Sequence, residues 1–101
     1  MQEAAGILEV YGCVAAFVAA DAAAKAADVW IQSLDKNKPA NADALPVPLI
    51  MCLKIRGSVA AVEAAMEAAA TAAEGITGVV TKHVIAAPAA DTEKMLRINA
   101  I

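Results

Sequence analysis

Residues 49–85 read LIMCLKIRGSVAAVEAAMEAAATAAEGITGVVTKHVI and predict a strand, a helix and a second strand. Residues 49–55 form a nearly continuous apolar run, which is typical of a strand in the middle of a sheet. Ser58 is a plausible N-cap for a helix that continues to about Glu74. Val79–Ile85 is rich in β-branched residues and is expected to be the next strand. This half of the chain is therefore expected to form one β-α-β unit.

The first half of the chain repeats this order. Residues 4–10 predict a strand, residues 13–27 a helix and residues 29–34 a second strand. Asp21 and Lys25 lie four residues apart and are expected to pair on the rim of the first helix. Apolar residues at three- and four-residue spacing are expected to form the buried stripes: Val14, Phe17, Val18 and Ala22 in the first helix, and Val59, Val62, Met66 and Ala70 in the second.

The two halves predict an α+β fold of the ferredoxin-like type, built from duplicated β-α-β units. We expect a four-stranded antiparallel sheet with two helices on one face. Asp91 or Thr92 can cap a short C-terminal helix that ends at Leu96. At 101 residues the chain is expected to be one domain, residues 1–101. Because its Ala-rich core buries little area per residue, we expect self-association to supplement its stability.

Composition argues against several classes of partner. The net charge is −3 and the eight Lys and Arg residues are scattered, which argues against a nucleic-acid partner. The chain is 60% hydrophobic because it is rich in Ala, yet no apolar run approaches the ~20 residues that span a membrane. The N-terminus has no pattern of an export signal. We therefore expect an intracellular protein that binds neither nucleic acid nor membrane.

No arrangement of residues predicts catalysis. Cys13 and Cys52 are far apart and are expected to be small buried hydrophobic residues, not a disulfide, a zinc site or reactive thiols. His83 is expected to be a structural residue inside its strand, and Glu63 and Glu67 are expected on a solvated helix face. Glycine patterns that bind phosphate are absent. We expect no enzyme activity, no metal and no cofactor.

The middle of the chain, residues 35–48, reads DKNKPANADALPVP and follows neither a helical nor a strand repeat. A loop of this length inside a compact domain is more often functional or mobile than a simple connection. The segment contains no Gly and includes Pro39, Pro46 and Pro48. The function is therefore expected to centre on it.

Several strings resemble those of a known family. They are ADAAAKAADV at residues 20–29, SVAAVEAA after Arg56-Gly57, and AAEGITGVVTKHVIAAP at residues 72–88. Together with AGILEVYGCVAAFVAADAA near the start, they resemble the bacterial microcompartment shell proteins of the single-domain (BMC domain), hexamer-forming type. The resemblance runs from about residue 4 to residue 96 in the family's unpermuted order, and only the long middle segment interrupts it.

This resemblance implies a structural tile rather than an enzyme. Members of the family form flat cyclic hexamers that join edge to edge into a shell around metabolic enzymes in the bacterial cytoplasm. A central pore, lined by the loop between the second and third strands, controls the passage of small metabolites. The implied partners are further copies of this chain, other shell proteins and encapsulated enzymes.

In this chain the implied pore loop is the extended segment 35–48. The implied pore-lining residues are Asp35, Lys36, Asn37, Lys38, Pro39, Asn41 and Asp43. Cyclic symmetry would turn their charges into rings of alternating sign. Lys25 and Asp28 fall at the family's edge between tiles. Ala87 and Ala89 stand where the family has an edge arginine and a histidine, so Asp28 is expected to compensate by pairing with Lys25 across the two-fold axis between tiles.

Three alternatives remain open. The fold is also compatible with a ferredoxin-like small-molecule binding or regulatory domain whose long loop folds over a metabolite. The altered edge is compatible with a pentamer or a non-planar ring. The long loop could narrow, cap or gate the pore, or it could be a disordered flap that lines nothing.

Overall fold

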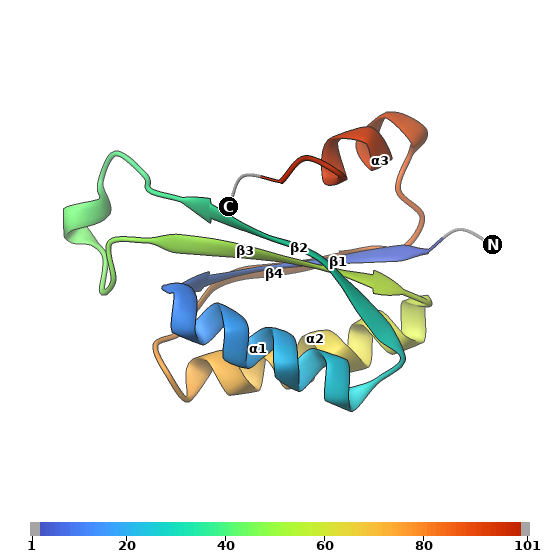
Figure 1. The fold of residues 1–101 in the computed structure, drawn as a ribbon, viewed down its shortest axis with the longest axis horizontal. Coiled ribbons are helices and arrows are strands. Elements are labelled where there is room, and N and C mark those ends of the chain that lie inside the picture. Colours follow the sequence, from blue (N-terminus) through green and yellow to red (C-terminus); the bar gives the residue numbers. More distant parts are fainter. Residues whose placement is uncertain (1–2, 100–101) are drawn as a thin grey trace.

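The strands and helices of the computed structural model, which describes residues 3–99, form layers around one sheet (Figure 1). Along the chain come β1 (Ala4–Tyr11), α1 (Cys13–Ala26), β2 (Val29–Asn37), a 3₁₀ turn η1 (Ala42–Ala44), β3 (Ile50–Gly57), α2 (Val59–Glu74), β4 (Val79–Ile85) and α3 (Ala90–Leu96). The strand order is β2-β3-β1-β4, and all neighbouring strands are antiparallel. Helices α1 and α2 lie side by side on one face and α3 lies on the other. The predicted fold class is confirmed.

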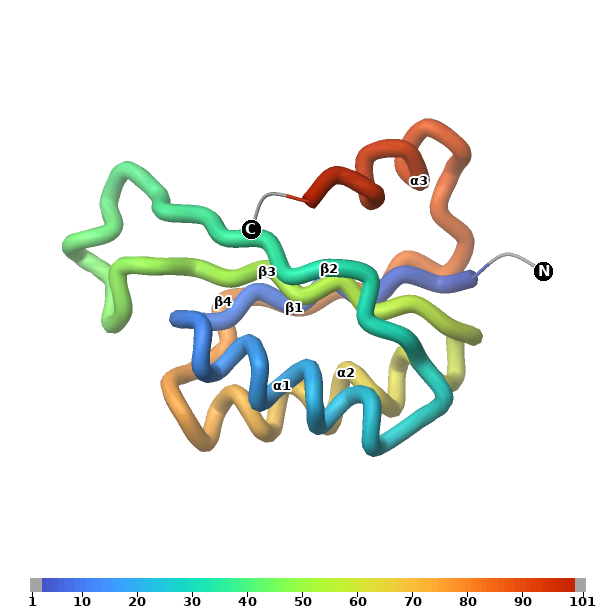
Figure 2. Tube along the Cα trace, viewed as in Figure 1, coloured from blue at the N-terminus to red at the C-terminus, as the bar shows by residue number. Residues whose placement is uncertain are grey.

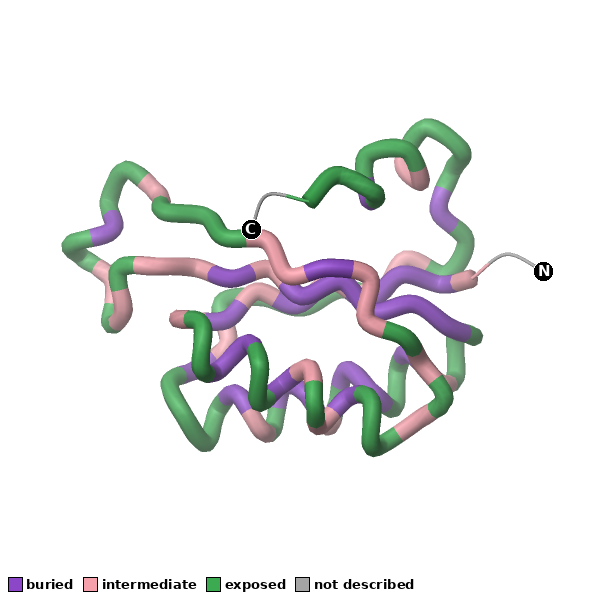
Figure 3. Tube along the Cα trace, viewed as in Figure 1, coloured by how far each residue is buried: buried purple, intermediate pink, exposed green. Residues whose placement is uncertain are grey.

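The core lies between the sheet and the two long helices (Figure 3). The sheet contributes large side chains, and the helices contribute mainly Ala. The largest fully buried apolar side chains include Leu8, Val10, Met51, Leu53, Ile55 and Val62. Helix α2 crosses so close to β1 that a Cβ added to Gly6 would lie 2.8 Å from Met66 Sδ. Small residues on both layers therefore allow the helices to approach the sheet closely.

The predicted buried stripe of α1 is wrong. Its buried residues are Ala15, Ala16, Ala19 and Ala23, whereas Val14, Phe17 and Val18 are 67%, 59% and 39% exposed. Both sets of residues follow the helical repeat, so the repeat alone does not say which side faces inward. The Ala side packs inward because α1 lies directly against α2, whose own buried side is also mostly Ala.

The predicted stripe of α2 is largely confirmed. Val62, Met66 and Ala70 are buried, but Val59 at the first position of the helix is 41% exposed. The predicted start is also confirmed, because the backbone N–H of Ala61 donates to Ser58 Oγ at 3.1 Å. Capping of this kind satisfies one of the free N–H groups in the first helical turn.

Two predicted boundaries differ from the structure. Strand β2 continues to Asn37 and β3 to Gly57, because the two strands pair along their whole length, from Val29 opposite Gly57 to Asn37 opposite Ile50. Helix α3 begins after Ala89, which makes no side-chain cap, so capping by Asp91 or Thr92 is not observed. Long-range contacts with the sheet hold α3 in place of a local cap.

Candidate functional site

The long segment between β2 and β3 projects beyond the sheet at one end of the molecule (Figures 1 and 2). It leaves the sheet after Asn37 and returns at Ile50, and these two residues pair at its base. The molecule measures 42 × 28 × 17 Å along its principal axes. The projecting arm, residues 38–49, extends the molecule along its longest axis.

The arm has its own hydrogen-bonded turn. In η1 the N–H groups of Ala42, Ala44 and Leu45 donate to the carbonyls of Pro39, Asn41 and Ala42 at 2.9–3.1 Å. The Ala42 side chain is buried beneath this turn.

The base of the arm is attached to the start of α1. The Gly12 N–H donates to the Leu49 carbonyl at 2.9 Å. Gly12 has a φ of +89°, and a Cβ there would lie 3.3 Å from Val47 Cγ1. These contacts give the arm a definite direction relative to the helices, because a non-glycine residue at this position would be strained.

The predicted pore-lining residues divide between strand and arm. Asp35, Lys36 and Asn37 belong to β2, so the predicted start of the irregular segment is wrong by three residues. The Asp35 carboxylate accepts from Ser33 Oγ at 3.2 Å and lies 2.8 Å from Lys54 Nζ. Its charge is therefore compensated within the chain. Lys36, Lys38, Asn41 and Asp43 are exposed, and Pro39 is half-buried.

Lys54 connects the base of the arm with the C-terminal segment. It is only 9% exposed, and its Nζ also donates to the carbonyls of Leu96 and Ile98, at 3.0 and 2.7 Å. Sequence reasoning missed this role. The available signal was a single Lys inside the apolar run of β3, because a buried ammonium requires partners.

Arg56 makes the second polar connection to the C-terminal region. It is 4% exposed, and its NH1 and NH2 groups donate to the two carboxylate oxygens of Glu93 on α3, at 2.8 and 2.5 Å. The same guanidinium donates to the carbonyls of Glu3 and Ala4 and to the Gln32 side chain. The hydrogen bonds from Arg56 hold the pKa of Glu93 below its usual range. Sequence reasoning placed Arg56 in a turn, whereas it is a buried strand residue.

The predicted edge residues lie at the opposite end of the sheet from the arm. Lys25, in the last turn of α1, pairs with Asp21 at 2.7 Å as expected, and both side chains are exposed. Asp28 is exposed between α1 and β2, and Ala87 follows β4. Pairing of β1 with β3 and β4, and of β3 with β2, aligns these positions at one end of the sheet. Nine residues of β2, about 30 Å, separate this end from the arm.

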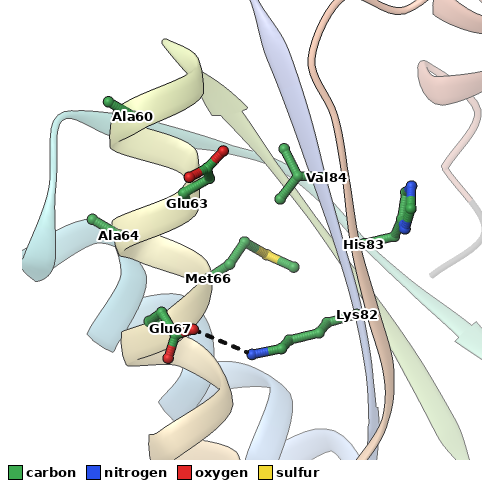
Figure 4. A pocket seen from close by; sticks show the side chains of 8 residues that line it. All are labelled: Ala60, Glu63, Ala64, Met66, Glu67, Lys82, His83 and Val84. Atoms are coloured by element: carbon green, nitrogen blue, oxygen red, sulfur yellow. Dashed lines mark ion pairs between the residues drawn. The ribbon is translucent and has the colours of Figure 1, made fainter.

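A groove of about 590 Å³ runs between α2 and β4 (Figure 4). Its lining residues are Ala60, Glu63, Ala64, Met66, Glu67, Lys82, His83 and Val84. Glu63 and Glu67 are exposed as predicted, but they border this groove, and Glu67 lies 3.6 Å from Lys82. His83 is exposed and points away from α2, so the prediction of an enclosed structural histidine is wrong.

The two thiols differ in their surroundings. Cys13 is exposed, contrary to the prediction, and Cys52 is half-buried. Burial, and then the nearby Glu9 and Asp35 carboxylates, raise the pKa of Cys52 to about 11, so its thiol stays protonated at neutral pH. Across residues 3–99, no group of three or more His, Cys, Asp and Glu side chains is placed to hold a metal.

Comparison with known proteins identifies the fold. The sequence model of the BMC domain matches residues 4–88, which includes the arm. The chain belongs to the BMC domain family of bacterial microcompartment shell proteins. The family expected from the sequence is therefore confirmed.

Relatives of the BMC domain chain support this membership. It is 38% identical to the microcompartment shell protein PduA of Citrobacter freundii over 95 residues, covering 94% of this chain and 92% of that protein. It is 36% identical to EutM of Escherichia coli K12, covering 96% and 91%. Both relatives are shell proteins, which agrees with the expectation of a structural rather than catalytic role.

A solved structure shares the BMC fold. It is a microcompartment protein from Desulfitobacterium hafniense, with a TM-score of 0.68, 28% identity, and coverage of 89% of this chain and 44% of that chain. Among the helices of residues 3–99, none is long and apolar enough to cross a membrane.

Proposed function

We propose that this protein is a cyclic hexameric tile of a bacterial microcompartment shell, and that the arm of each subunit borders a central opening. Small metabolites pass through this opening. The tile assembles with other shell proteins in the cytoplasm, around encapsulated enzymes. The long arm narrows the opening in comparison with a tile that has a short loop.

The observation that carries this proposal is the separation of the two predicted sites. The arm lies at one end of β2, and Lys25 and Asp28 lie at the other end. A wedge-shaped subunit in a ring has one end near the symmetry axis and one end at the perimeter. With the arm at the inner end, the edge residues reach the perimeter, where a neighbouring tile is met.

The charges of the arm favour small anions at this opening. Asp35 is compensated by Lys54, so it adds little to the potential at the axis. Lys36, Lys38 and Asp43 are exposed, and within residues 3–99 none of the three is in an ion pair. Each subunit therefore contributes an excess of positive charge. Repetition around the axis concentrates this charge in a ring.

Native mass spectrometry together with electron microscopy tests the proposal. We expect a species of six chains, and a density map with residues 38–49 around the symmetry axis. A monomer at micromolar concentration would contradict the proposed tile. A ring with the arm at its perimeter would contradict the proposed pore.

A further inference from the structure

Helix α1 presents an unusual surface on the side that faces away from the core. We define the α1 patch as Val14, Phe17 and Val18, which are the large side chains of this helix and are all exposed. The remaining residues of α1 are mostly Ala, so the patch protrudes from a helix that is otherwise narrow. An apolar projection of this kind on a small domain is typical of a contact surface.

The groove between α2 and β4 has the opposite shape. Met66 and Val84 supply apolar lining, and Ala60 and Ala64 supply methyl groups too small to fill the space between the helix and the strand (Figure 4). Glu63, Glu67 and Lys82 form a polar border. A hydrophobic centre within a polar rim is the usual anatomy of a protein–protein contact.

The α1 patch and the groove lie on opposite sides of the same subunit. Helix α1 packs over β2 and β3, and α2 packs over β1 and β4. Strands β2 and β4 are the two edges of the sheet. One subunit therefore cannot cover its own groove with its own patch. A contact between different surfaces of identical subunits is heterologous and leads to a ring when the rotation closes.

We infer that the α1 patch of one subunit inserts Phe17 into the α2/β4 groove of the next subunit. This inference rests on the proposed ring and names the surfaces that close it. The aromatic ring of Phe17 is the largest side chain of the patch, and the groove of about 590 Å³ has room for it. The two surfaces also carry both signs of charge at their borders, Asp21 and Lys25 beside the patch and Glu67 and Lys82 beside the groove. This arrangement permits opposite charges to meet around an apolar centre.

Two complementary variants test this contact. Phe17→Glu places a charge on the patch and leaves the groove intact, and Ala64→Glu fills the groove beside Glu63 and Glu67 and leaves the patch intact. Glu has a good helix propensity, so both helices are expected to form. Each variant alone is expected to lose the ring. An equimolar mixture is expected to form dimers with one chain of each variant, because each pair retains one intact contact and cannot add further subunits.

The controls separate the possible failures. The unmodified chain must first give its ring by native mass spectrometry, and a monomer at this step would refute the proposed function itself. Met95→Glu, at an exposed apolar position on α3, is expected to keep the ring. If the unmodified chain forms a ring and both Glu variants keep it, the inferred contact is wrong and the tile remains. If both variants become monomers and their mixture stays monomeric, the pairing of these two surfaces is also wrong.

Cross-linking provides a test that does not depend on the fold of a charged variant. In a Cys13→Ser background, the double variant Phe17→Cys and Ala64→Cys is treated with a short bismaleimide. We expect a ladder of covalent species up to the number of chains in the ring. Either single cysteine variant should give no ladder, and a ladder absent from the double variant would overturn the inferred contact.

Discussion

Lys54 and Arg56 are the residues that attach the C-terminal region to the sheet. They alternate along β3 with the core residues Leu53 and Ile55, so they point to the face that α3 covers. Their partners are 42 and 37 residues away in the chain. The sequence shows that β3 contains two cations, but only the folded chain brings the carbonyls and the Glu93 carboxylate to them.

Removal of the Lys54 charge is expected to destabilise the protein. Lys54→Met leaves the Asp35 carboxylate and two carbonyls without their donor, and loss of one partner of a buried ion pair costs about 3–5 kcal/mol. Urea unfolding measures this change. Lys94→Met is the matched control, since it removes an exposed Lys–Asp pair on α3 and should cost less than about 1 kcal/mol. Equal effects of the two variants would contradict the role of Lys54.

The Arg56–Glu93 pair predicts a dependence of stability on pH. Because the pKa of Glu93 is lowered in the folded state, the unfolded chain binds this proton more readily. The stabilisation is fully present above the unfolded-state pKa of about 4.3 and is lost as the pH falls through the folded-state pKa. Urea unfolding between pH 7 and pH 3 should show a weaker loss in Glu93→Gln than in the unmodified chain. Glu63→Gln, on an exposed helix face, should keep the original slope, and identical slopes in all three proteins would disprove the linkage.

At the scale of elements, local patterns predicted most strands and helices, and packing decided how they face. The strand Val79–Ile85 and the cap at Ser58 were predicted correctly because both depend on short-range chemistry. The inward side of α1 was not, because its Ala residues and its larger apolar residues share one repeat. The extension of β2 to Asn37 depends on pairing with β3, which no local pattern contains.

The arm between β2 and β3 is expected to be dispensable for folding. Replacing residues 38–48 by a short glycine-containing turn should change the free energy of unfolding by no more than about 1 kcal/mol, because a shorter loop also lowers the entropy of loop closure. The ring mass should persist, and its opening should be wider in electron-microscopy reconstructions. A Gly/Ser segment of the original length is the control for composition. A lost ring in the shortened variant would show that the arm holds subunits together.

At the scale of the whole molecule, the sheet places the arm and the edge residues about 30 Å apart. Lys25 already pairs with Asp21 in the same helix, and both side chains are exposed. Exposed pairs of this kind contribute about 0–1 kcal/mol, so Lys25 is free to exchange partners when a second tile approaches. Asp28 is the neighbouring acid at this edge.

Asp28→Ala is expected to weaken the association of tiles and leave each ring intact. The reason is that Ala87 supplies no side-chain donor at the edge, which leaves Lys25 with Asp28 as the charged contact across the two-fold axis. Electron microscopy of two-dimensional sheets, or co-assembly with other shell proteins, measures this effect. Ala87→Arg is the converse variant and should strengthen sheets, because a planar guanidinium makes several hydrogen bonds. Sheets unchanged by Asp28→Ala would remove the proposed role of Asp28.

The amino-acid sequence by itself determined the order of elements, the family and the position of the long segment, because strand repeats, helix caps and family strings are properties of neighbouring residues. Only the tertiary structure decided which side of α1 is buried, which charges are compensated and which end of the sheet carries the arm. Those features depend on contacts between residues far apart in the chain. Close packing of two Ala-rich helices left Phe17 outside, and burial of Lys54 and Arg56 required partners from the C-terminal region.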